Sequence, residues 1–450
     1  ASLPSRDEEM NIYVQPMEDD GDGGSSGEAK QITRSKSDQW SPVWFPDNRH
    51  LAYSSDQNGI YQIYVVNIES GETTQITFGD ADSEYPIVSP DGSQIAFVSE
   101  KNEANIFSFS LSDQTETAQT SNVNLQLFPD ISTDGRRLAF HTTRSRLFSS
   151  ELKIKPLDSD DEPTIVAQGG HARLSPDGRA LAFVRFDDKA LNLWRVDADG
   201  RNEKRLINEG IVPGAYAEIP YEFFTTYFSW SPDGSQIAYV SAKSGQPNVW
   251  TVAAEADGSG AQQLTDNAEA NLQLNSPLWS PDGNRVAYTA RTRPQTTVEK
   301  PQNRVYVAEN GRSKIVWQGD SPIRLLGWSA TGAEVFVAVK EAEEIAVYKI
   351  SVVEGEKKTP PVVARLPGAN IHAVRLSPDR RNLAFVARRD ERDNIFQVSA
   401  EPGGGEIRQL TANPDPTLYY SGLAWSPDGQ KLFYSKQTGG LQISLITNPK

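Results

Sequence analysis

The chain has 450 residues, of which 37% are hydrophobic and 23% are charged, a composition typical of a folded globular protein. Its formal net charge of -16 argues against nucleic acid as a partner, because phosphate backbones bind positively charged surfaces. The chain has no cysteine, which excludes disulfides, thiolate metal sites and cysteine nucleophiles. No apolar run reaches the roughly 18 residues of a membrane span, so we expect no membrane insertion.

The N-terminal region predicts a tail and two strands. Residues 1–10 predict a flexible tail, and residues 11–14 and 31–33 predict strands. The acidic, Gly/Ser-rich stretch between these strands predicts a loop. Residues 23–27 within it formally match the GxSxG nucleophile pattern, but that pattern requires a strand before it and a helix after it. We therefore interpret the match as part of the loop.

A five-residue motif recurs along the rest of the chain. The sequence WSPDG stands at residues 230–234, 279–283 and 425–429, and looser copies stand at 44–48, 88–92, 131–135, 174–178, 328–332 and 376–380. The nine copies follow one another at steps of 44, 43, 43, 56, 49, 49, 48 and 49 residues. This spacing is typical of the blades of a β-propeller.

The segments after each copy predict the strands of one repeating unit. In the unit that begins at residue 230, residues 236–240 and 248–252 predict two apolar strands, and a Gln-Leu-Thr segment at 263–265 predicts another. With the strand that carries the motif, the unit is a four-stranded antiparallel sheet. A sheet this small cannot bury its faces alone, so neighbouring sheets must stack on it.

The motif itself predicts a tight turn. Proline presets φ for a type I turn, aspartate can bond the backbone that follows it, and glycine accepts a left-handed conformation. Carboxylates repeated so regularly along the chain are turn formers and not one active site. The positions predicted to form the turns are Asp91, Gly92, Asp134, Gly135, Asp177, Gly178, Asp233, Gly234, Asp282, Gly283, Asp428 and Gly429.

The WSPDG turn, the strand after it and the closing Gln-Leu-Thr resemble the repeat of the TolB-like, WD-like β-propeller family. The resemblance implies an all-β fold in which residues 1–450 form one β-propeller of four-stranded antiparallel blades. Nine motif copies favour nine blades, with eight as the alternative. The two strands before the first motif and the two or three strands after the last one would complete one blade together and close the ring.

Two histidines suggest an alternative interpretation, in which the chain holds a metal ion. Some propeller lyases with this type of repeat bind a divalent metal in the central channel through several histidines. His171 and His372 lie just before the turn motif, on strands expected to be innermost, and could form such a site. The simpler interpretation is that they are isolated polar residues on strand faces, so we expect no metal and no other cofactor.

The longest motif step carries a cluster of aromatic residues. Residues 211–224 account for the excess length of the 56-residue step, and long loops with aromatic side chains are often binding sites. The predicted partner-binding residues are Tyr216, Tyr221, Phe223, Phe224 and Tyr227. Alternatively, these aromatic residues fold inward and plug one end of the channel.

Together these features predict a noncatalytic binding or scaffold module. We expect a monomer that binds a protein or peptide partner, or a small ligand at the channel mouth. A periplasmic or extracellular location is expected, with the cytoplasm as the alternative. Two further possibilities are a lyase-like or hydrolase-like enzyme with a channel metal, and a propeller that gates a separate peptidase domain.

Overall fold

The computed structural model describes residues 10–16, 28–35, 37–121, 124–143, 150–187, 190–212, 227–269, 271–293, 300–342, 344–353, 360–367 and 371–449. Every regular secondary-structure element in these ranges is a β-strand, so the predicted all-β class is confirmed. Nowhere in these ranges is there a helix of the length and apolar character needed to cross a membrane. Contacts divide the chain into unit 1, residues Ala1–Glu103 and Thr438–Lys450, and unit 2, residues Ala104–Gln437. The single domain expected from the sequence stays a prediction.

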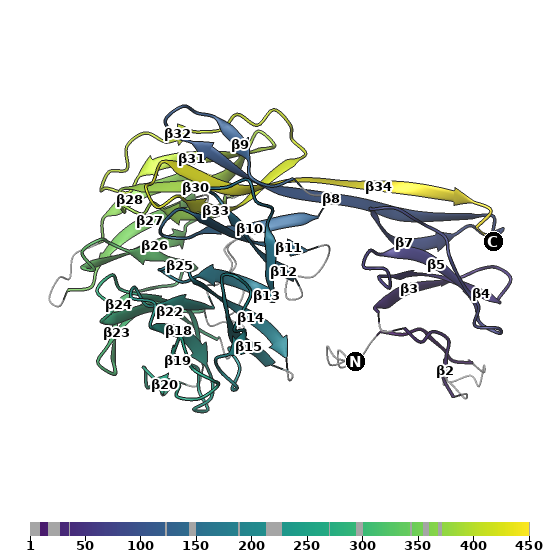
Figure 1. Cartoon of the computed structure of the whole chain (residues 1–450), viewed down its shortest axis with the longest axis horizontal. Coiled ribbons are helices and arrows are strands. Elements are labelled where there is room, and N and C mark those ends of the chain that lie inside the picture. The colour runs from purple at the N-terminus through teal and green to yellow at the C-terminus, as the bar shows by residue number, and fades with distance from the viewer. Residues whose placement is uncertain are drawn as a thin grey trace. The chain divides into compact units, whose positions relative to one another are not determined.

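Unit 1 is built from stacked sheets (purple in Figure 1). A four-stranded antiparallel sheet has buried side chains on both faces: Leu51 and Tyr53 pack with Ile12, and Ile63 packs with Phe97 from the next sheet. The strands of the four-stranded sheet are β3 (Gln39–Trp44), β4 (His50–Ser55), β5 (Gln62–Asn67) and β6 (Thr73–Gln75). The other strands are β1 (Tyr13–Val14), β2 (Lys30–Gln31), β7 (Asp82–Val88), the first part of β8 (Gln94–Ser110) and the last part of β34 (Lys431–Thr447).

The C-terminal strand has a different partner from the one that the sequence predicts. Among the described strands, β1 pairs with β2, whereas β34 pairs with β8 and β33. Strands β8 and β34 are each one continuous strand of 17 residues, where the repeat pattern predicts two shorter strands. Closure of a ring by the two terminal regions therefore stays a prediction.

Unit 2 contains four-stranded antiparallel sheets in chain order (teal to yellow-green in Figure 1). Four of them, as far as the structure describes the chain, are β17–β20, β21–β24, β25–β28 and β29–β32. Their strands are β17 (Phe228–Trp230), β18 (Gln236–Ser241), β19 (Asn248–Ala253), β20 (Gln262–Gln263), β21 (Leu272–Trp279), β22 (Arg285–Thr292), β23 (Asn303–Glu309), β24 (Arg312–Gly319), β25 (Ile323–Trp328), β26 (Glu334–Lys340), β27 (Glu344–Ser351), β28 (Val362–Pro367), β29 (Ile371–Leu376), β30 (Asn382–Arg389), β31 (Arg392–Ser399) and β32 (Arg408–Gln409).

The remaining strands of unit 2 join one continuous sheet. Strand β13 connects two parts of it, because residues 164–169 pair with β12 and residues 170–174 pair with β14. These strands are β9 (Glu116–Ala118), β10 (Leu125–Ile131), β11 (Arg137–Thr143), β12 (Ser150–Pro156), β13 (Thr164–Leu174), β14 (Ala180–Asp187), β15 (Ala190–Asp197), β16 (Lys204–Arg205) and β33 (Leu418–Trp425), with the last part of β8 and the first part of β34.

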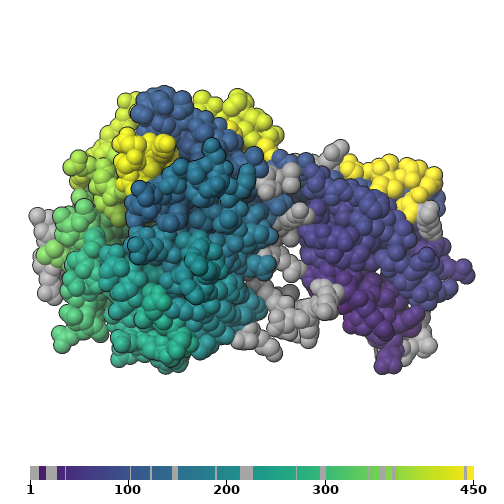
Figure 2. Space-filling view, viewed as in Figure 1, coloured from purple at the N-terminus to yellow at the C-terminus, as the bar shows by residue number. Residues whose placement is uncertain are grey.

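Seven of the nine motif copies lie in unit 2, each at the end of a strand that we call an inner strand. The inner strands are β10, β13, β17, β21, β25, β29 and β33. Inner strands of successive sheets contact one another, for example β21 with β25 and β25 with β29, and β33 contacts β10. In Figure 2 the side chains of successive sheets form a continuous surface from blue through teal to green. The inner strands thus share one region, and their side chains determine what it can bind.

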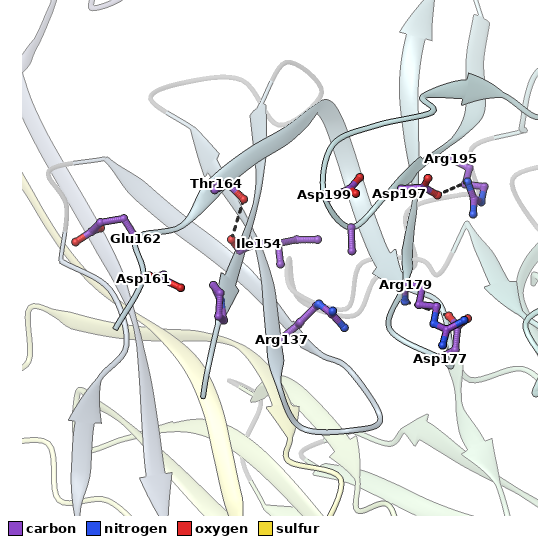
Figure 3. Close-up of a pocket in the computed structure, with 12 residues that line it drawn as sticks. Arg137, Ile154, Asp161, Glu162, Thr164, Asp177, Arg179, Arg195, Asp197 and Asp199 are labelled. Atoms are coloured by element: carbon purple, nitrogen blue, oxygen red, sulfur yellow. Dashed lines mark hydrogen bonds and ion pairs between the residues drawn. The ribbon is translucent and has the colours of Figure 1, made fainter. Parts of the chain in front are cut away.

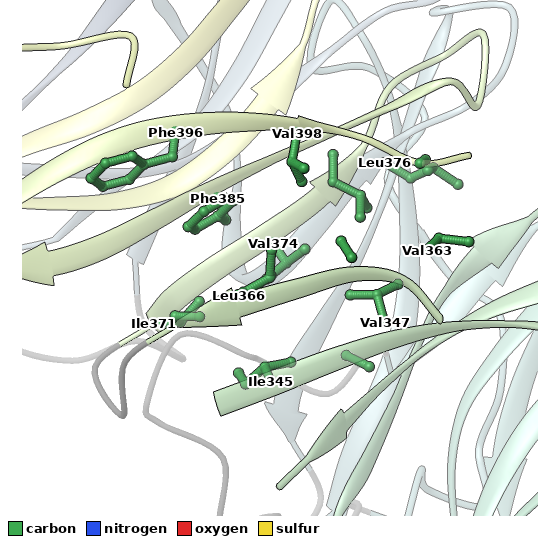
Figure 4. Close-up of a cluster of buried hydrophobic side chains, with 14 of the residues drawn as sticks. Ile345, Val347, Val363, Leu366, Ile371, Val374, Leu376, Phe385, Phe396 and Val398 are labelled. Carbon is green, nitrogen blue, oxygen red and sulfur yellow. The ribbon is translucent and has the colours of Figure 1, made fainter. Parts of the chain in front are cut away.

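Apolar side chains from neighbouring sheets form the core between them. Val347 and Leu366 of one sheet pack against Val374, Phe385 and Phe396 of the next (Figure 4). The Phe385 and Phe396 rings stack with centroids 5.3 Å apart, and both side chains are buried. Each buried aromatic contributes about 1.5–3 kcal/mol, which explains why middle strands such as β30 are apolar on both faces.

Candidate functional site

The motif turns place the ends of the inner strands. In the copy at 230–234, the Ser231 Oγ donates a 2.6 Å hydrogen bond to Asp233 Oδ1 and accepts one of 2.9 Å from the Gln236 N–H. Asp233 Oδ1 also accepts a 3.0 Å bond from the Ser235 N–H, and the Gly234 N–H donates a 2.9 Å bond to the Ser231 carbonyl. The hydrogen bonds that Ser231 and Ser235 donate to its carboxylate lower the pKa of Asp233 to about 2. The aspartate is occupied in the turn and is not positioned for proton transfer.

The glycines of the motif have left-handed backbones. Their φ angles are 73° at Gly92, 72° at Gly135, 67° at Gly178, 71° at Gly234, 70° at Gly283 and 68° at Gly429. The aspartates before them accept a hydrogen bond from a motif serine: Asp91, Asp134, Asp177, Asp282 and Asp428. This geometry gives all of these residues a structural part in the turns.

One position on the inner strands lines the space that they share. It lies two residues before the motif serine and is occupied, in chain order, by Asp130, Arg173, Ser229, Leu278, Gly327, Arg375 and Ala424. All of these except Gly327 line two cavities of about 540 and 390 Å³. The cavities have residues 130, 131, 133, 173 and 375 in common, so we call them together the inner-strand cavities. Together they are large enough for a small organic ligand.

Charged side chains gather at these cavities. Asp130, Arg173, Arg324 and Arg375 all line the smaller cavity. Burial raises the pKa of the Asp130 carboxyl, although the positive charges of Arg173 and Arg375 oppose the effect. Burial, together with the charges of Arg375 and Arg173, lowers the pKa of the Arg324 guanidinium. Burial is the largest cause of both shifts, and charges in a buried site interact strongly.

The structure brings together two residues that the sequence assigns to different predicted sites. The ring of His171, a candidate metal ligand, lies edge-on to the ring of Tyr227, a candidate partner-binding residue, with centroids 4.5 Å apart. Burial and the nearby charge of Arg173 lower the pKa of His171 to about 3, so the imidazole is neutral at neutral pH. Tyr227 also packs against the buried cluster between two sheets.

The structure does not describe the side chains of the other candidate site residues. Tyr216, Tyr221, Phe223 and Phe224 lie outside the described residues, and so does the side chain of His372, whose backbone belongs to β29. Among the side chains that are described, no group of three or more His, Asp or Glu could hold a metal ion. The aromatic partner-binding site and the two-histidine metal site both stay predictions.

A third cavity of unit 2 shares no described lining residue with the inner-strand cavities. Its volume is about 720 Å³, and its lining includes Arg137, Arg179, Arg195, Asp161 and Asp199 (Figure 3). Arg195 is already paired, with Asp197 at 2.7 Å and Glu255 at 3.0 Å. The described lining has five carboxylates and three arginines, so this cavity is acidic, unlike the inner-strand cavities.

Sequence reasoning missed the arginines of the inner-strand cavities. Aligning the seven motif copies of unit 2 on their serine places Asp130, Arg173 and Arg375 at one position, where the other copies have Ser229, Leu278, Gly327 and Ala424. Three copies have a charged residue at this position, where the other copies have a small or apolar one, and this difference is the signal in the sequence that could have indicated the site. Arg324 lies five residues before its motif serine and could not be found in this way.

Comparisons with known proteins identify related sequences and folds. A family model described as the TolB beta propeller domain matches residues 2–126 and 113–307. The uncharacterized protein Atu1656 of Agrobacterium fabrum is 30% identical over 95 residues, which are 21% of this chain and 27% of that protein, so the chain spans about a quarter of this curated relative.

Two solved structures are similar to this chain at low sequence identity. An oligogalacturonate lyase from Vibrio parahaemolyticus is 16% identical, with a TM-score of 0.44 over 77% of this chain and 98% of that one. TolB from Acinetobacter baumannii is 14% identical, with a TM-score of 0.37 over 67% of this chain and 73% of that one.

Proposed function

Because the chain belongs to the TolB beta-propeller family, we propose that it is a noncatalytic binding module that takes a small ligand at the inner-strand cavities of unit 2. The observation that supports the proposal is that two cavities of about 540 and 390 Å³ share five residues at the place where the inner strands converge. Small-molecule sites are typically concave, with a few polar groups in a mainly apolar lining. The larger cavity combines apolar side chains, Leu376, Leu423 and Trp425, with arginines and is more polar than a typical site of this kind.

The blade number remains part of the proposal. Nine motif copies support nine blades, and they divide into two in unit 1 and seven in unit 2. Strands β8 and β34, each 17 residues long, have the length of two blade strands, which supports a closed form in which each folds back as a hairpin. A ring closed by the terminal regions is proposed on this basis.

The location and the oligomeric state are also proposals. A periplasmic or extracellular location rests on family membership alone. A monomer is expected, and light scattering on the purified chain tests this. Binding of a protein or peptide through Tyr216, Tyr221, Phe223, Phe224 and Tyr227, a channel metal at His171 and His372, and a gated peptidase domain stay predictions without further support.

A cavity-filling substitution tests the proposed function. Ser229 lines the smaller cavity, and Ser229→Trp fills it without a change in charge. Ser259→Trp is the matched control, because Ser259 is an exposed loop residue. Isothermal titration with malonate, inorganic phosphate, glucose and glycylglycine measures binding. We expect at least one probe to bind the wild type, with an affinity at least about tenfold weaker in Ser229→Trp and unchanged in Ser259→Trp. Equal affinity in Ser229→Trp, or no binding of any probe, would contradict the proposal.

A further inference from the structure

One outer strand of unit 2 differs in length from the strands at the same place in other sheets. Strand β24 (Arg312–Gly319) has 8 residues and forms the edge of its sheet (Figure 1). The outer strands β6, β9, β16, β20 and β32 have only 2 or 3 residues each. Strand β28 has 6 residues, and two of them, Val363 and Leu366, are fully buried. Among the described outer strands, β24 is therefore the longest, and its first four residues are all exposed.

A two-residue turn sets the length of β24. Asn310 and Gly311 have left-handed backbones, with φ angles of 50° and 75°, which is the geometry of a tight hairpin turn with Asn-Gly at its centre. The turn joins β23 to β24, and the two strands pair along the whole of β24. The segment lacks the closing Gln-Leu-Thr of other units, whose sheets are complete with outer strands of 2 residues. The long edge of β24 is thus more than the sheet itself requires.

The outward edge of β24 offers backbone groups for hydrogen bonding. A strand at the edge of a sheet pairs on one side only, so alternate N–H and C=O groups point away from the sheet. Within the described ranges, the backbone of β24 pairs with β23 and forms no hydrogen bond with another segment. Residues 312–315 are exposed, which leaves this half of the edge open to solvent. An extended segment beside β24 can therefore hydrogen-bond to it as a further strand.

The two faces of β24 carry different side chains. Lys314 lies opposite Val307, on the face toward the next sheet, and its Nζ donates a 2.6 Å hydrogen bond to the Val352 carbonyl. Arg312 is two residues away and shares this face. Ile315 lies on the other face and is 46% exposed. No described carboxylate oxygen lies within the 4.0 Å of an ion pair from either cation. One face of the edge is thus positively charged and the other is apolar.

We infer that β24 binds an extended acidic segment of a partner protein, which adds to the sheet as a further strand. Main-chain hydrogen bonds hold such a segment, and its alternate side chains contact the two faces of the edge. Acidic side chains on one face meet Arg312 and Lys314, and apolar side chains on the other meet Ile315. A second copy of β24 would bring its own two cations to the same pair of strands, so charge favours an acidic partner over self-pairing. None of these three residues lines the inner-strand cavities, and the inference does not depend on the function proposed for them.

The test compares peptides that differ in charge and in alternation. Isothermal titration uses the acetylated and amidated hexapeptides EVEVEV, KVKVKV and EEEVVV, and hydrogen exchange followed by mass spectrometry locates the amides that a bound peptide protects. The double variant Arg312→Glu with Lys314→Glu reverses the charge of the edge. Arg312→Glu alone serves if the double variant does not fold, since Lys314 also holds the Val352 carbonyl. Arg408→Glu is the matched control, because Arg408 is an exposed arginine on β32, an outer strand of only 2 residues.

We expect EVEVEV to bind the wild type at least about tenfold more tightly than KVKVKV and about threefold more tightly than EEEVVV, and to protect amides within residues 312–319. The double variant should prefer KVKVKV instead. Arg312→Glu alone should weaken EVEVEV about threefold or more, and Arg408→Glu should leave its affinity unchanged.

Three results would overturn the inference. The first is no binding of EVEVEV at about 1 mM, or equal affinity for EVEVEV and KVKVKV. The second is binding without protection of amides in β24, which would place the peptide elsewhere. The third is a dimer of the free chain, seen by light scattering, in which these amides are already protected, because a second copy would then occupy the edge.

Discussion

The indole Nε1 of Trp230 donates a 3.1 Å hydrogen bond to the backbone carbonyl of Arg173, and so joins β17 to the neighbouring inner strand β13. The Trp425 indole makes the same contact with the Arg375 carbonyl at 3.3 Å. The first residue of the motif therefore links adjacent sheets. It also fixes the backbone of two arginines that line the inner-strand cavities.

Trp230→Phe removes this link and keeps the aromatic packing. We expect a loss of about 1 kcal/mol in the free energy of unfolding, because the Arg173 carbonyl loses its donor. Denaturant titration measures the change. Trp44→Phe is the control, since Trp44 has the same motif position in unit 1 but is 44% exposed, and its replacement should change stability by less than about 0.5 kcal/mol. Equal effects of the two substitutions would contradict the role assigned to Trp230.

Gly234→Val tests the turn geometry. The φ angle of 71° is strained for a β-branched residue, so we expect a loss of about 1–3 kcal/mol in the free energy of unfolding. A Cβ at this position meets its nearest atom, Pro176 Cδ, at 3.4 Å, so the cost arises from the backbone and not from a clash. Gly234→Asn should cost less, because asparagine tolerates the left-handed region. A neutral Gly234→Val would show that the turn assignment is wrong.

The sequence predicts the features that depend on local chemistry. The turns at residues 230–234 and 279–283 and the strands after them follow from Pro, Asp and Gly at fixed spacing, and the structure has strands at the expected segments, for example β18 and β19. The all-β class and the four-stranded antiparallel sheets follow from the same repeat. These features are predictable because each is determined within one repeat.

Features that depend on which strands pair with one another cannot be predicted from the repeat alone. The segment 94–110 has the pattern of two strands, yet β8 is one strand of 17 residues, and its last part lies in unit 2 with β34. Strand pattern alone does not specify which edge a strand pairs with. The cavity arginines illustrate the same limit, since Arg173 and Arg324 are far apart in sequence and share a cavity only through the arrangement of the sheets.

The closing Gln-Leu-Thr segment supports a third prediction. Thr265 Oγ1 accepts a 2.9 Å hydrogen bond from the buried Val249 N–H and donates one of 2.9 Å to Asn248 Oδ1. Thr265→Val keeps the shape but leaves both groups without this partner, so we expect a loss of about 1–3 kcal/mol in the free energy of unfolding. Thr265→Ser retains the hydroxyl and should recover most of it. Equal losses in the two variants would show that the methyl group, and not the hydroxyl, is what matters.

Glu84 on β7 makes the stability of unit 1 depend on pH. Burial, with the charges of Asp82 and Glu100 adding to it, raises the pKa of Glu84 to about 7 from an ordinary value of 4.5. Because the folded state binds this proton more tightly than the unfolded state, the contribution of Glu84 to stability falls as pH rises from about 5 to about 8. Glu84→Gln removes the titration, so its Tm should exceed that of the wild type by roughly 1–3 °C at pH 8 and match it at pH 5. The control is Glu69→Gln, since the Glu69 side chain is 69% exposed and should change the pH profile little. Parallel Tm profiles of wild type and Glu84→Gln from pH 5 to 8 would show that Glu84 ionises normally in the folded protein.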